Sequence, residues 1–353
     1  MTTPAITYEP VSFADLRGWA GDDHLAAFVA FCASARVITK PPRLLAAGAV
    51  ALAVAPSITT AKAARAFFET HFAPARVVHD GPAGMLTGYY EPVIDGSLEP
   101  APPFSVPIYR RPADLENVVA ESERAAKSDG FSHMRRTARG LEPYPTRAEI
   151  ERGALAGRGL ELVYLADPVE AFFLHVQGSG AIRLRDGRLQ RITYDGKNGR
   201  PYTSVGRTLI EDRTFAPGGL TLQVLGDWLR ADLERAREIL WRNESFVFFR
   251  ALDADSPIGV LGTALFEQRS LAVDPAYHAL GLPIYVSAPD MSHSGRGGFH
   301  TLMVAQDVGS AIKGPERGDI YFGTGEAALA HAGITKHAGR FFVLLPKQDV
   351  GAS

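Results

Sequence analysis

From residue 245 onward, the chain is divided into short segments that each have the length and composition of a β-strand. They are rich in β-branched and aromatic residues, and turn-forming residues separate them. One helix-like segment, GEAALAHAGI, interrupts the series. Many short strands with regular turns are typical of a small β-barrel or sandwich. The expected strands are SFVFFRAL, GVLGTAL, RSLAV, LPIYVSA, FHTLMVAQD, DIYFGTG and RFFVLLP.

The first 80 residues predict helices. Asp22 and Asp23 can cap a helix that carries Leu25 to Cys32, and Thr59 or Thr60 can cap a helix in TTAKAARAFFETHF. Between them, the run LLAAGAVALAVA predicts a buried helix, because it is too short to span a bilayer, which needs about 20 residues. The segment MLTGYYEPVI then predicts a strand that breaks at Asp95-Gly96.

The middle of the chain predicts a mixture of helices and strands. A Pro-rich stretch over residues 97–112 suggests a crossing between domains, residues 119–127 suggest a helix, and residues 130–145 suggest a long loop. Thr146 and Glu149 form a capping box for a short helix. The segments LELVYLA and AFFLHVQ predict strands, and AIRLRDGRLQRITY predicts a hairpin with a type I′ turn at Asp186-Gly187. One long amphipathic helix is expected over residues 221–243, with an apolar face of Leu222, Leu225, Leu229, Leu233 and Leu240.

The length and net charge of the chain limit the number of domains and the class of protein to be expected. A chain of 353 residues predicts two domains, and a formal net charge of -2 argues against a nucleic-acid binder. The single cysteine, Cys32, excludes an internal disulfide and falls at a position of helical periodicity, which predicts a buried thiol. The first residues lack the pattern of a signal peptide, so we expect a processed form or an intracellular protein.

Two aspartates in the stretch VAQDVGSAIKGPERGDIYFGTG are the strongest candidates for chemistry. Asp307 ends one expected strand and Asp319 begins another, and a strand end can hold a side chain rigidly over a cleft. A carboxyl group in a partly apolar site has its pKa raised by desolvation, as a general acid at neutral pH requires. Lys313 lies between the two acids in sequence and would lower that pKa if its ammonium group came near.

Aromatic and amide side chains favour a glycan as the ligand, because sugar rings offer both apolar faces and polar groups. In TGYYEP, the strand alternation would turn one of Tyr89 and Tyr90 to a groove and the other inward. In HVQGSG, Gln177 and Ser179 can bind hydroxyl or N-acetyl groups. Phosphate-binding loops, dinucleotide fingerprints, nucleophile elbows and zinc-binding histidine pairs are absent from the sequence, so we expect no cofactor and no metal.

Several blocks together resemble the membrane-bound lytic murein transglycosylase A family. They occur in the family's order, and the last of them resembles its aspartate-bearing "3D" domain. The resemblance implies a double-psi β-barrel, similar to those of barwin, endoglucanases and expansins, formed by residues 1–92 and 254–353 together with the N-terminal helices. It also implies a smaller, inserted β-rich domain over residues 93–253, with a substrate groove between the two domains. The blocks are TGYYEP, PIYRRPADL, LVYLADPVEAFFLHVQGSGAIRL, NESFVFFR and the segment from VAQDVGSAIKGPERGDIYFGTG to AGITKHAGRFFVLLP.

The resemblance also implies a reaction. It is the cleavage of the β-1,4 bond between N-acetylmuramic acid and N-acetylglucosamine in peptidoglycan, with formation of 1,6-anhydromuramoyl ends. Asp319 corresponds to the family's catalytic acid and would serve as acid and base, with Asp307 in support. We expect the substrate-binding residues to be Thr87, Gly88, Tyr89, Tyr90, Gln177, Gly178, Ser179, Lys313 and Gly323.

Two other functions stay open at this point. A hydrolytic muramidase would use the same acid with water as the nucleophile, and an expansin-like protein would bind wall glycan without cutting it. The resemblance implies a periplasmic protein with peptidoglycan strands as its partner, and we expect a monomer. Outer-membrane attachment and contacts with cell-wall synthesis or division proteins are further expectations of the resemblance.

Overall fold

The computed structural model describes residues 5–119, 131–216, 220–292, 297–309 and 312–347. The chain forms two compact units, one from Met1–Pro92 and Ala254–Ser353 and the other from Val93–Asp253. The expected helix over residues 119–127 lies almost entirely outside the described residues. Within the described ranges, no helix has the length and apolar character that a membrane span requires.

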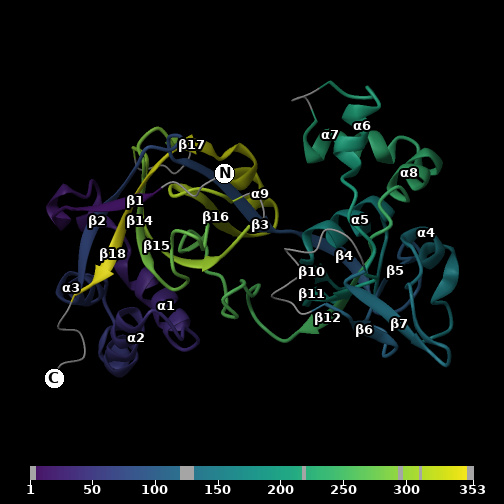
Figure 1. Cartoon of the computed structure of the whole chain (residues 1–353), viewed down its shortest axis with the longest axis horizontal. Helices are drawn as coiled ribbons and strands as arrows, with labels where there is room; N and C mark the ends of the chain where they lie inside the picture. The colour runs from purple at the N-terminus through teal and green to yellow at the C-terminus, as the bar shows by residue number, and fades with distance from the viewer. Residues whose placement is uncertain (1–4, 120–130, 217–219, 293–296, 310–311, 348–353) are drawn as a thin grey trace. The chain divides into compact units, whose positions relative to one another are not determined.

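The first unit is built on a nine-stranded sheet (Figure 1). Most neighbouring strands are antiparallel, but β13 pairs with β15, and β16 with β3, in parallel. Among the described residues β1 and β17 are the free edges, so the expected closed barrel is not found, although the prediction of a mainly β fold with N-terminal helices is confirmed. In spatial order the strands are β1 Ile6–Pro10, β2 Phe72–His79, β18 Arg340–Pro346, β14 Pro283–Ala288, β15 Phe299–Asp307, β13 Ser270–Val273, β16 Arg317–Thr324, β3 Met85–Glu91 and β17 Lys336–Ala338.

Helices pack against this sheet, and their caps follow the sequence. Asp23 accepts a hydrogen bond from the amide of Ala26, and Thr60 accepts one from the amide of Ala63, as predicted. Cys32 is buried, also as predicted. The helix of the apolar run exists, but Leu45 on its outer side is exposed. The helices are α1 His24–Ala35, α2 Pro42–Val54, α3 Ala61–His71 and α9 Glu326–Ile334, with the shorter turns η1 Phe13–Asp15, η2 Trp19–Gly21 and η3 Ala55–Ser57.

A buried ion pair joins the N-terminal segment to the sheet. Asp22, which precedes the cap of α1, accepts hydrogen bonds from the guanidinium group of Arg269 at 3.0 and 2.9 Å. It also accepts one from the backbone amide of Leu302 at 2.7 Å. A buried carboxylate needs such partners, because an unpaired charge in the core is costly. The N-terminal segment is therefore tied to β15, which carries Asp307, and to the start of β13.

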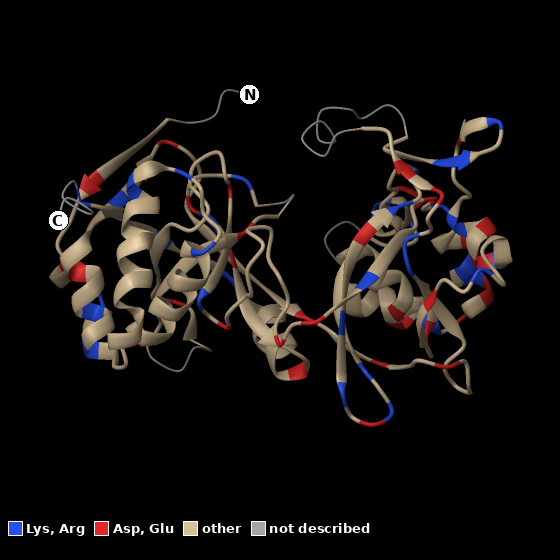
Figure 2. Ribbon diagram, turned by 90° about the horizontal axis from the view of Figure 1, so that it is seen from below, with Lys and Arg blue, Asp and Glu red and all other residues tan. Residues whose placement is uncertain are grey.

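The second unit contains a six-stranded sheet and a three-stranded sheet. Acidic and basic residues are interspersed along the ribbons of both units (Figure 2). The larger sheet consists of β12 Val247–Leu252, β11 Leu189–Lys197, β10 Ser179–Arg183, β4 Val93–Ser97, β9 Glu161–Leu165 and β5 Val106–Tyr109, and the smaller of β6 Leu115–Asn117, β7 His133–Thr137 and β8 Gly140–Glu142. The helices are α4 Arg147–Glu149, η5 Ile150–Ala154, α5 Pro168–Gln177, α6 Val205–Glu211, α7 Leu222–Arg230 and α8 Leu233–Leu240.

Four predictions for the middle of the chain need correction. AFFLHVQ is the helix α5 rather than a strand, because Asp167 caps it and Pro168 suits its first turn. Strands β7 and β8 lie within the stretch expected to be a loop. The hairpin turns at Asp186-Gly187, but only Gly187 has a positive φ, which fits a three-residue loop and not a type I′ turn. The strand break falls at Pro92, and β4 runs through Asp95 and Gly96.

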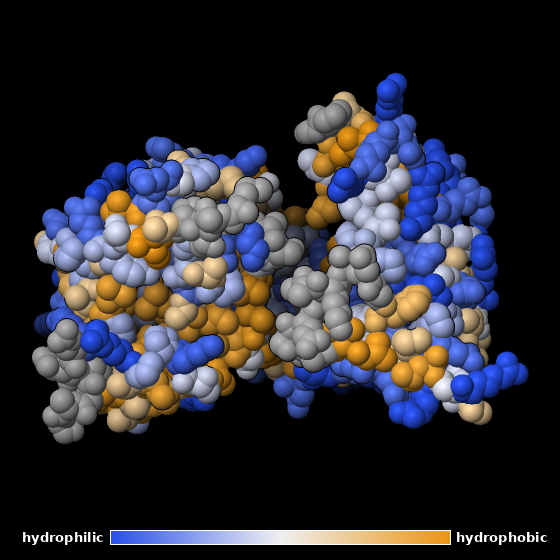
Figure 3. Space-filling view, viewed as in Figure 1, coloured by the Kyte–Doolittle hydropathy of each residue, from blue (hydrophilic) through white to orange (hydrophobic). Residues whose placement is uncertain are grey.

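The expected long amphipathic helix is two helices, α7 and α8. Asp232 interrupts it, because its carboxylate accepts a hydrogen bond from the amide of Arg235 and so caps α8. Leu225, Leu229 and Leu240 are buried, whereas Leu222 and Leu233 are exposed. Figure 3 shows apolar residues at the surface over α6 and α7. In the first unit, the expected strand GVLGTAL is a loop with one isolated bridge, and β17 is a strand that the pattern did not predict.

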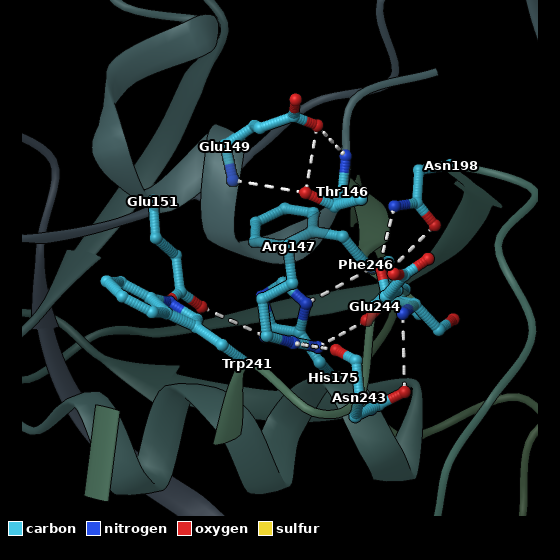
Figure 4. Close-up of polar contacts among 12 residues, drawn as sticks. Thr146, Arg147, Glu149, Glu151, His175, Asn198, Trp241, Asn243, Glu244 and Phe246 are labelled. Atoms are coloured by element: carbon cyan, nitrogen blue, oxygen red, sulfur yellow. Dashed lines mark hydrogen bonds and ion pairs between the residues drawn. The ribbon is translucent and has the colours of Figure 1, made fainter. Parts of the chain in front are cut away.

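Arg147 organises the polar interior of the second unit (Figure 4). Its side chain is 2% exposed and donates hydrogen bonds to the carbonyl oxygens of Asn243 and Ser245. It also forms an ion pair with Glu151 and lies over the ring of Phe246. The capping box of Thr146 and Glu149, which the sequence predicts, holds the start of the helix that carries Arg147. The guanidinium group therefore links α4 to the segment that leads into β12.

Replacing Arg147 by Met should destabilise the second unit by about 3 kcal/mol, because two buried carbonyl oxygens lose their donor. Urea unfolding followed by tryptophan fluorescence can measure this, since Trp228 and Trp241 lie in the second unit. Arg207→Met is the matched control: Arg207 is exposed and pairs with Glu211, so its loss should cost less than about 1 kcal/mol. Equal effects of the two substitutions would contradict the role of Arg147.

Candidate active site

Four neighbouring strands of the first unit place the candidate acids in one row. Strand β13 lies between β15 and β16, and Ala272 pairs with Asp307 on one side and with Asp319 on the other. Asp319 in turn pairs with Thr87 of β3. Side chains at directly paired positions project from the same face of a sheet. The two aspartates and Thr87 therefore share a face, although they are far apart in sequence.

Asp319 is half-buried and has a specific partner. The hydroxyl group of Thr87 donates a hydrogen bond to Oδ1 of Asp319 at 2.5 Å. Burial raises the pKa of Asp319 above its ordinary value, and the charge of Asp307 raises it further, whereas the Thr87 hydrogen bond and the positive charge of Arg317 lower it. Burial dominates, so the carboxyl group holds its proton to a higher pH than an exposed aspartic acid does.

Asp307 has a different environment, because three donors bind its carboxylate. Oδ1 accepts hydrogen bonds from the backbone amides of Val260 and Val308, both at 3.0 Å. Oδ2 accepts one from the hydroxyl group of Tyr89 at 3.1 Å. Hydrogen bonds to both oxygens fix the orientation of a carboxyl group. Asp307 is thus a fixed acceptor that also holds the loop around Val260 in place.

The residue before Asp307 anchors the end of β15. Gln306 is fully buried, and its amide nitrogen donates to the carbonyl oxygen of Ala30 and to the hydroxyl group of Ser34 on α1. Its amide oxygen accepts a hydrogen bond from Ser270 of β13. The strand end that carries Asp307 is therefore fixed to both a helix and a neighbouring strand.

Tyr89 and Tyr90 face opposite ways. The ring of Tyr89 lies 5.3 Å from that of Tyr321, centroid to centroid, and its hydroxyl group reaches Asp307. Burial raises the pKa of Tyr89 well above its ordinary value, and the neighbouring Asp307 adds to the shift, so the phenol stays protonated. Tyr90 packs against the main hydrophobic core of the first unit.

At two of the predicted site glycines, a residue with a side chain would not fit. A Cβ on Gly88 would lie 2.6 Å from the ring of Phe322 and 2.8 Å from Cα of Ala332, so α9 packs directly on this point of β3. Gly323 has a φ of +102°, and a Cβ there would lie 2.9 Å from the carboxylate of Glu267. Both positions thus support the packing around the row of acids.

The remaining predicted residues are one in the first unit and three in the second. Lys313 is exposed, and its ammonium group lies 3.8 Å from the carboxylate of Asp274. Gln177, Gly178 and Ser179 belong to the second unit. Gln177 is exposed at the end of α5, Gly178 ends that helix with a φ of +81°, and Ser179 begins β10.

Arg317 is a site residue that the sequence analysis missed. Its guanidinium group donates to the hydroxyl group of Thr87 at 2.9 Å. The available signal was its position two residues before Asp319, because alternate residues of a strand share a face. That signal is weak without the knowledge that β3 lies beside β16.

The chemistry available to the row is proton transfer. Asp319, a carboxyl group with a raised pKa, can give and take a proton, and Asp307 lies on the same face with both oxygens already hydrogen-bonded. The described residues contain no group of three or more histidine, cysteine, aspartate or glutamate side chains suited to hold a metal ion. The donors present around Asp319 are a hydroxyl and a guanidinium group.

Comparison with known proteins identifies the family. Residues 85–250 match the family model described as the MltA specific insert domain, and residues 269–345 match the 3D domain. A crystal structure of MltA from Neisseria gonorrhoeae superimposes with a TM-score of 0.85 at 32% sequence identity and covers 98% of this chain and 95% of that one. The chain belongs to the membrane-bound lytic murein transglycosylase A family. The resemblance seen in the sequence is thereby confirmed.

Two further members of the MltA family extend the comparison. The membrane-bound lytic murein transglycosylase A of Vibrio cholerae is 34% identical over 265 residues, which are 74% of this chain and 65% of that protein. The chain therefore spans just under two thirds of that relative. A crystal structure of Escherichia coli MltA with bound chitohexaose is 26% identical, with a TM-score of 0.66, and covers 98% of this chain and 95% of that one. Asp307 and Asp319 both fall in the matched 3D domain.

The raised pKa of Asp319 predicts a pH-dependent effect on stability. Below about pH 4 the acid is protonated in both the folded and the unfolded chain. As the pH rises through the folded pKa, the unfolded chain has already released this proton, so the acid lowers the stability of the fold. Asp319→Asn should therefore be more stable than the wild type at pH 7, with a smaller difference at pH 4.

Urea unfolding of both proteins across this pH range measures the effect. Asp290→Asn, which removes an exposed aspartate from the same unit, should show little change with pH. A stability difference between Asp319→Asn and the wild type that is the same at pH 4 and pH 7 would argue against the raised pKa.

Proposed function

We propose that this protein is a lytic transglycosylase that cleaves the β-1,4 bond between N-acetylmuramic acid and N-acetylglucosamine in peptidoglycan. The observation that carries the proposal is the environment of Asp319: a half-buried carboxyl group with a raised pKa, held by Thr87, in a member of the MltA family. The names of its relatives and the chitohexaose bound to the Escherichia coli protein support a glycan of N-acetylated sugars as the substrate.

The proposed mechanism needs only one acid. Protonated Asp319 donates its proton to the glycosidic oxygen while the bond between that oxygen and C1 of the muramoyl residue breaks. The resulting carboxylate takes the proton of the C6 hydroxyl group, whose oxygen bonds to C1 and closes the 1,6-anhydro ring. No water is consumed, and Asp319 ends as it began. An intramolecular nucleophile has a high effective concentration, which removes the need for a second carboxylate to activate water.

Asp307 supports this chemistry by its charge. Positive charge develops at C1 in the transition state, and an ionised carboxylate on the same face stabilises it. The same charge contributes to the raised pKa of Asp319. Because its oxygens already accept three hydrogen bonds, Asp307 is poorly suited to take a proton from a nucleophile.

The finer features of the proposal concern architecture and location. The parallel pairs β13–β15 and β16–β3 within a largely antiparallel sheet support a double-psi barrel as the form of the first unit.

We assign the first unit the catalytic role and the second a role in binding the glycan strand, with Gln177, Gly178, Ser179 and Lys313 as further substrate contacts. The relatives' printed names support membrane association, and the substrate implies the periplasm. We propose further that the protein is a monomer and that it contacts the cell-wall machinery.

A hydrolytic muramidase is the second candidate, favoured by the presence of Asp307 on the same face. Asp307 and Asp319 are two strands apart, which separates their backbones by about 10 Å. An inverting hydrolase uses two carboxyl groups far enough apart to admit a water molecule. Its products would carry reducing muramic acid ends and would be heavier by one water than the anhydro products.

Digestion of purified peptidoglycan with mass spectrometry of the muropeptides tests the function. We expect anhydro ends from the wild type and a loss of at least about 100-fold in the rate for Asp319→Asn, because general acid catalysis contributes about 10²–10⁴-fold. Asp290→Asn, at an exposed site, should keep full activity. Reducing ends would favour the hydrolase, and a wild type that binds peptidoglycan but releases no muropeptides would favour an expansin-like binding protein. An unchanged rate for Asp319→Asn would contradict the role of Asp319 as the acid.

A further inference from the structure

Arg317 is arranged to act on the hydroxyl group of Thr87. It precedes Asp319 by two residues in β16, so the two side chains leave the same face of the sheet. Nη2 of Arg317 donates to Oγ1 of Thr87 at 2.9 Å, and Nη1 donates to the carbonyl oxygen of Gly318 at 2.5 Å. The backbone contact fixes the guanidinium group, so its second nitrogen is directed at the threonine hydroxyl.

This contact determines the direction of the hydrogen bond between Thr87 and Asp319. A hydroxyl group has one proton to donate and two lone pairs that accept, whereas a guanidinium group can only donate. The Arg317 bond occupies one lone pair of Oγ1 and leaves the hydroxyl proton available, and Thr87 donates that proton to Oδ1 of Asp319. Among the described residues, Asp319 is the acceptor that the Thr87 hydroxyl reaches.

We propose that Arg317 is a positioning residue that acts through Thr87 to keep Oδ1 of Asp319 a hydrogen-bond acceptor, which leaves Oδ2 as the oxygen that carries the transferable proton. The inference rests on the proposed function, because it specifies which atom of the proposed acid meets the substrate. Arg317 itself does not touch the reacting atoms in this scheme. Its effect is to remove one of two possible proton positions and to orient the carboxyl group.

The charged groups around Asp319 shift its pKa in both directions. Asp307 raises the pKa of Asp319, whereas Arg317 and the Thr87 hydrogen bond lower it, and burial outweighs both. Tyr89 is a protonated phenol bonded to Asp307. Lys336 of β17 pairs with Thr87 in register and is exposed. Loss of either Arg317 or the Thr87 hydroxyl group should therefore move the titration of Asp319 to higher pH.

The test combines titration with kinetics. The Asp319 carboxyl carbon, assigned by its absence from Asp319→Asn, is followed by ¹³C NMR against pH in the wild type, Arg317→Met, Thr87→Val and the double variant. Each single substitution should raise the pKa of Asp319. If Arg317 acts through Thr87, its substitution should have a smaller effect in the Thr87→Val background than in the wild type.

Kinetics on peptidoglycan provide the second readout. For Arg317→Met we expect kcat to fall about tenfold, as for a lost hydrogen bond to a charged group, with KM changed less than about twofold. The alkaline limb of the kcat profile should move to higher pH together with the NMR titration. Thr87→Ser keeps the hydroxyl group and should restore the wild-type profile. Arg43→Met, at an exposed arginine of α2, is the matched control.

The outcomes separate this inference from the proposed function. Strictly additive shifts in the double variant, or an Asp319 titration unchanged in Arg317→Met, would overturn the role of Arg317 even if the wild type produces anhydro ends. A wild type that yields no anhydro ends would overturn the proposed function instead, and with it the assignment of a transferable proton to Oδ2. If Arg317→Met does not fold by circular dichroism, Arg317→Gln replaces it in every comparison.

Discussion

The pairing of β13 with both β15 and β16 is the constraint on which the candidate site depends. This strand has only four residues, all buried, and one of them, Ala272, is in register with both aspartates. Because Ala has a small side chain, the position between the two acids offers little to obstruct a ligand or to separate their charges. The register sets which face the acids occupy, and a shift by one residue would turn either acid to the other side of the sheet.

The N-terminal helices contribute to the site through the same strands. Gln306 precedes Asp307 at an irregularity in the register of β15 with β13. Gln306 bonds to Ala30 and Ser34 of α1, while Asp307 faces Tyr89 and the loop at Val260. The buried pair of Asp22 and Arg269 adds a second connection just before β13. Residues far from the acids in sequence thus restrict the position of one of them.

The sequence predicted the parts of the fold whose signals are local. Caps at Asp23 and Thr60, the capping box at Thr146 and the alternating strands near the C-terminus depend on neighbouring residues, and they are present. The errors arose where a longer-range contact or a cap competes with periodicity. AFFLHVQ has the composition of a strand, yet the preceding Asp-Pro pair starts a helix.

The same distinction between local signals and long-range contacts applies to the candidate site. Asp307 and Asp319 could be selected from the sequence, because both adjoin strand-like runs. The hydrogen bond from Thr87 to Asp319 could not, since it depends on the parallel pairing of β3 with β16, across 232 positions in sequence. Arg317 was missed for the same reason: its partner is defined only by that pairing. Fold membership could be recognised from the ordered motifs, whereas the hydrogen-bond geometry required coordinates.

The two aspartates differ because of their donors and not because of their residue type. Asp307 accepts hydrogen bonds from two backbone amides and a phenol. Asp319 accepts one hydroxyl group and is more strongly affected by desolvation, which favours its neutral form. The strand on each side of Ala272 therefore holds a carboxyl group with different donors and a different degree of burial. A reaction with a single proton donor needs one carboxyl group with a raised pKa, and Asp319 has it because of where its strand lies and how little backbone donates to it.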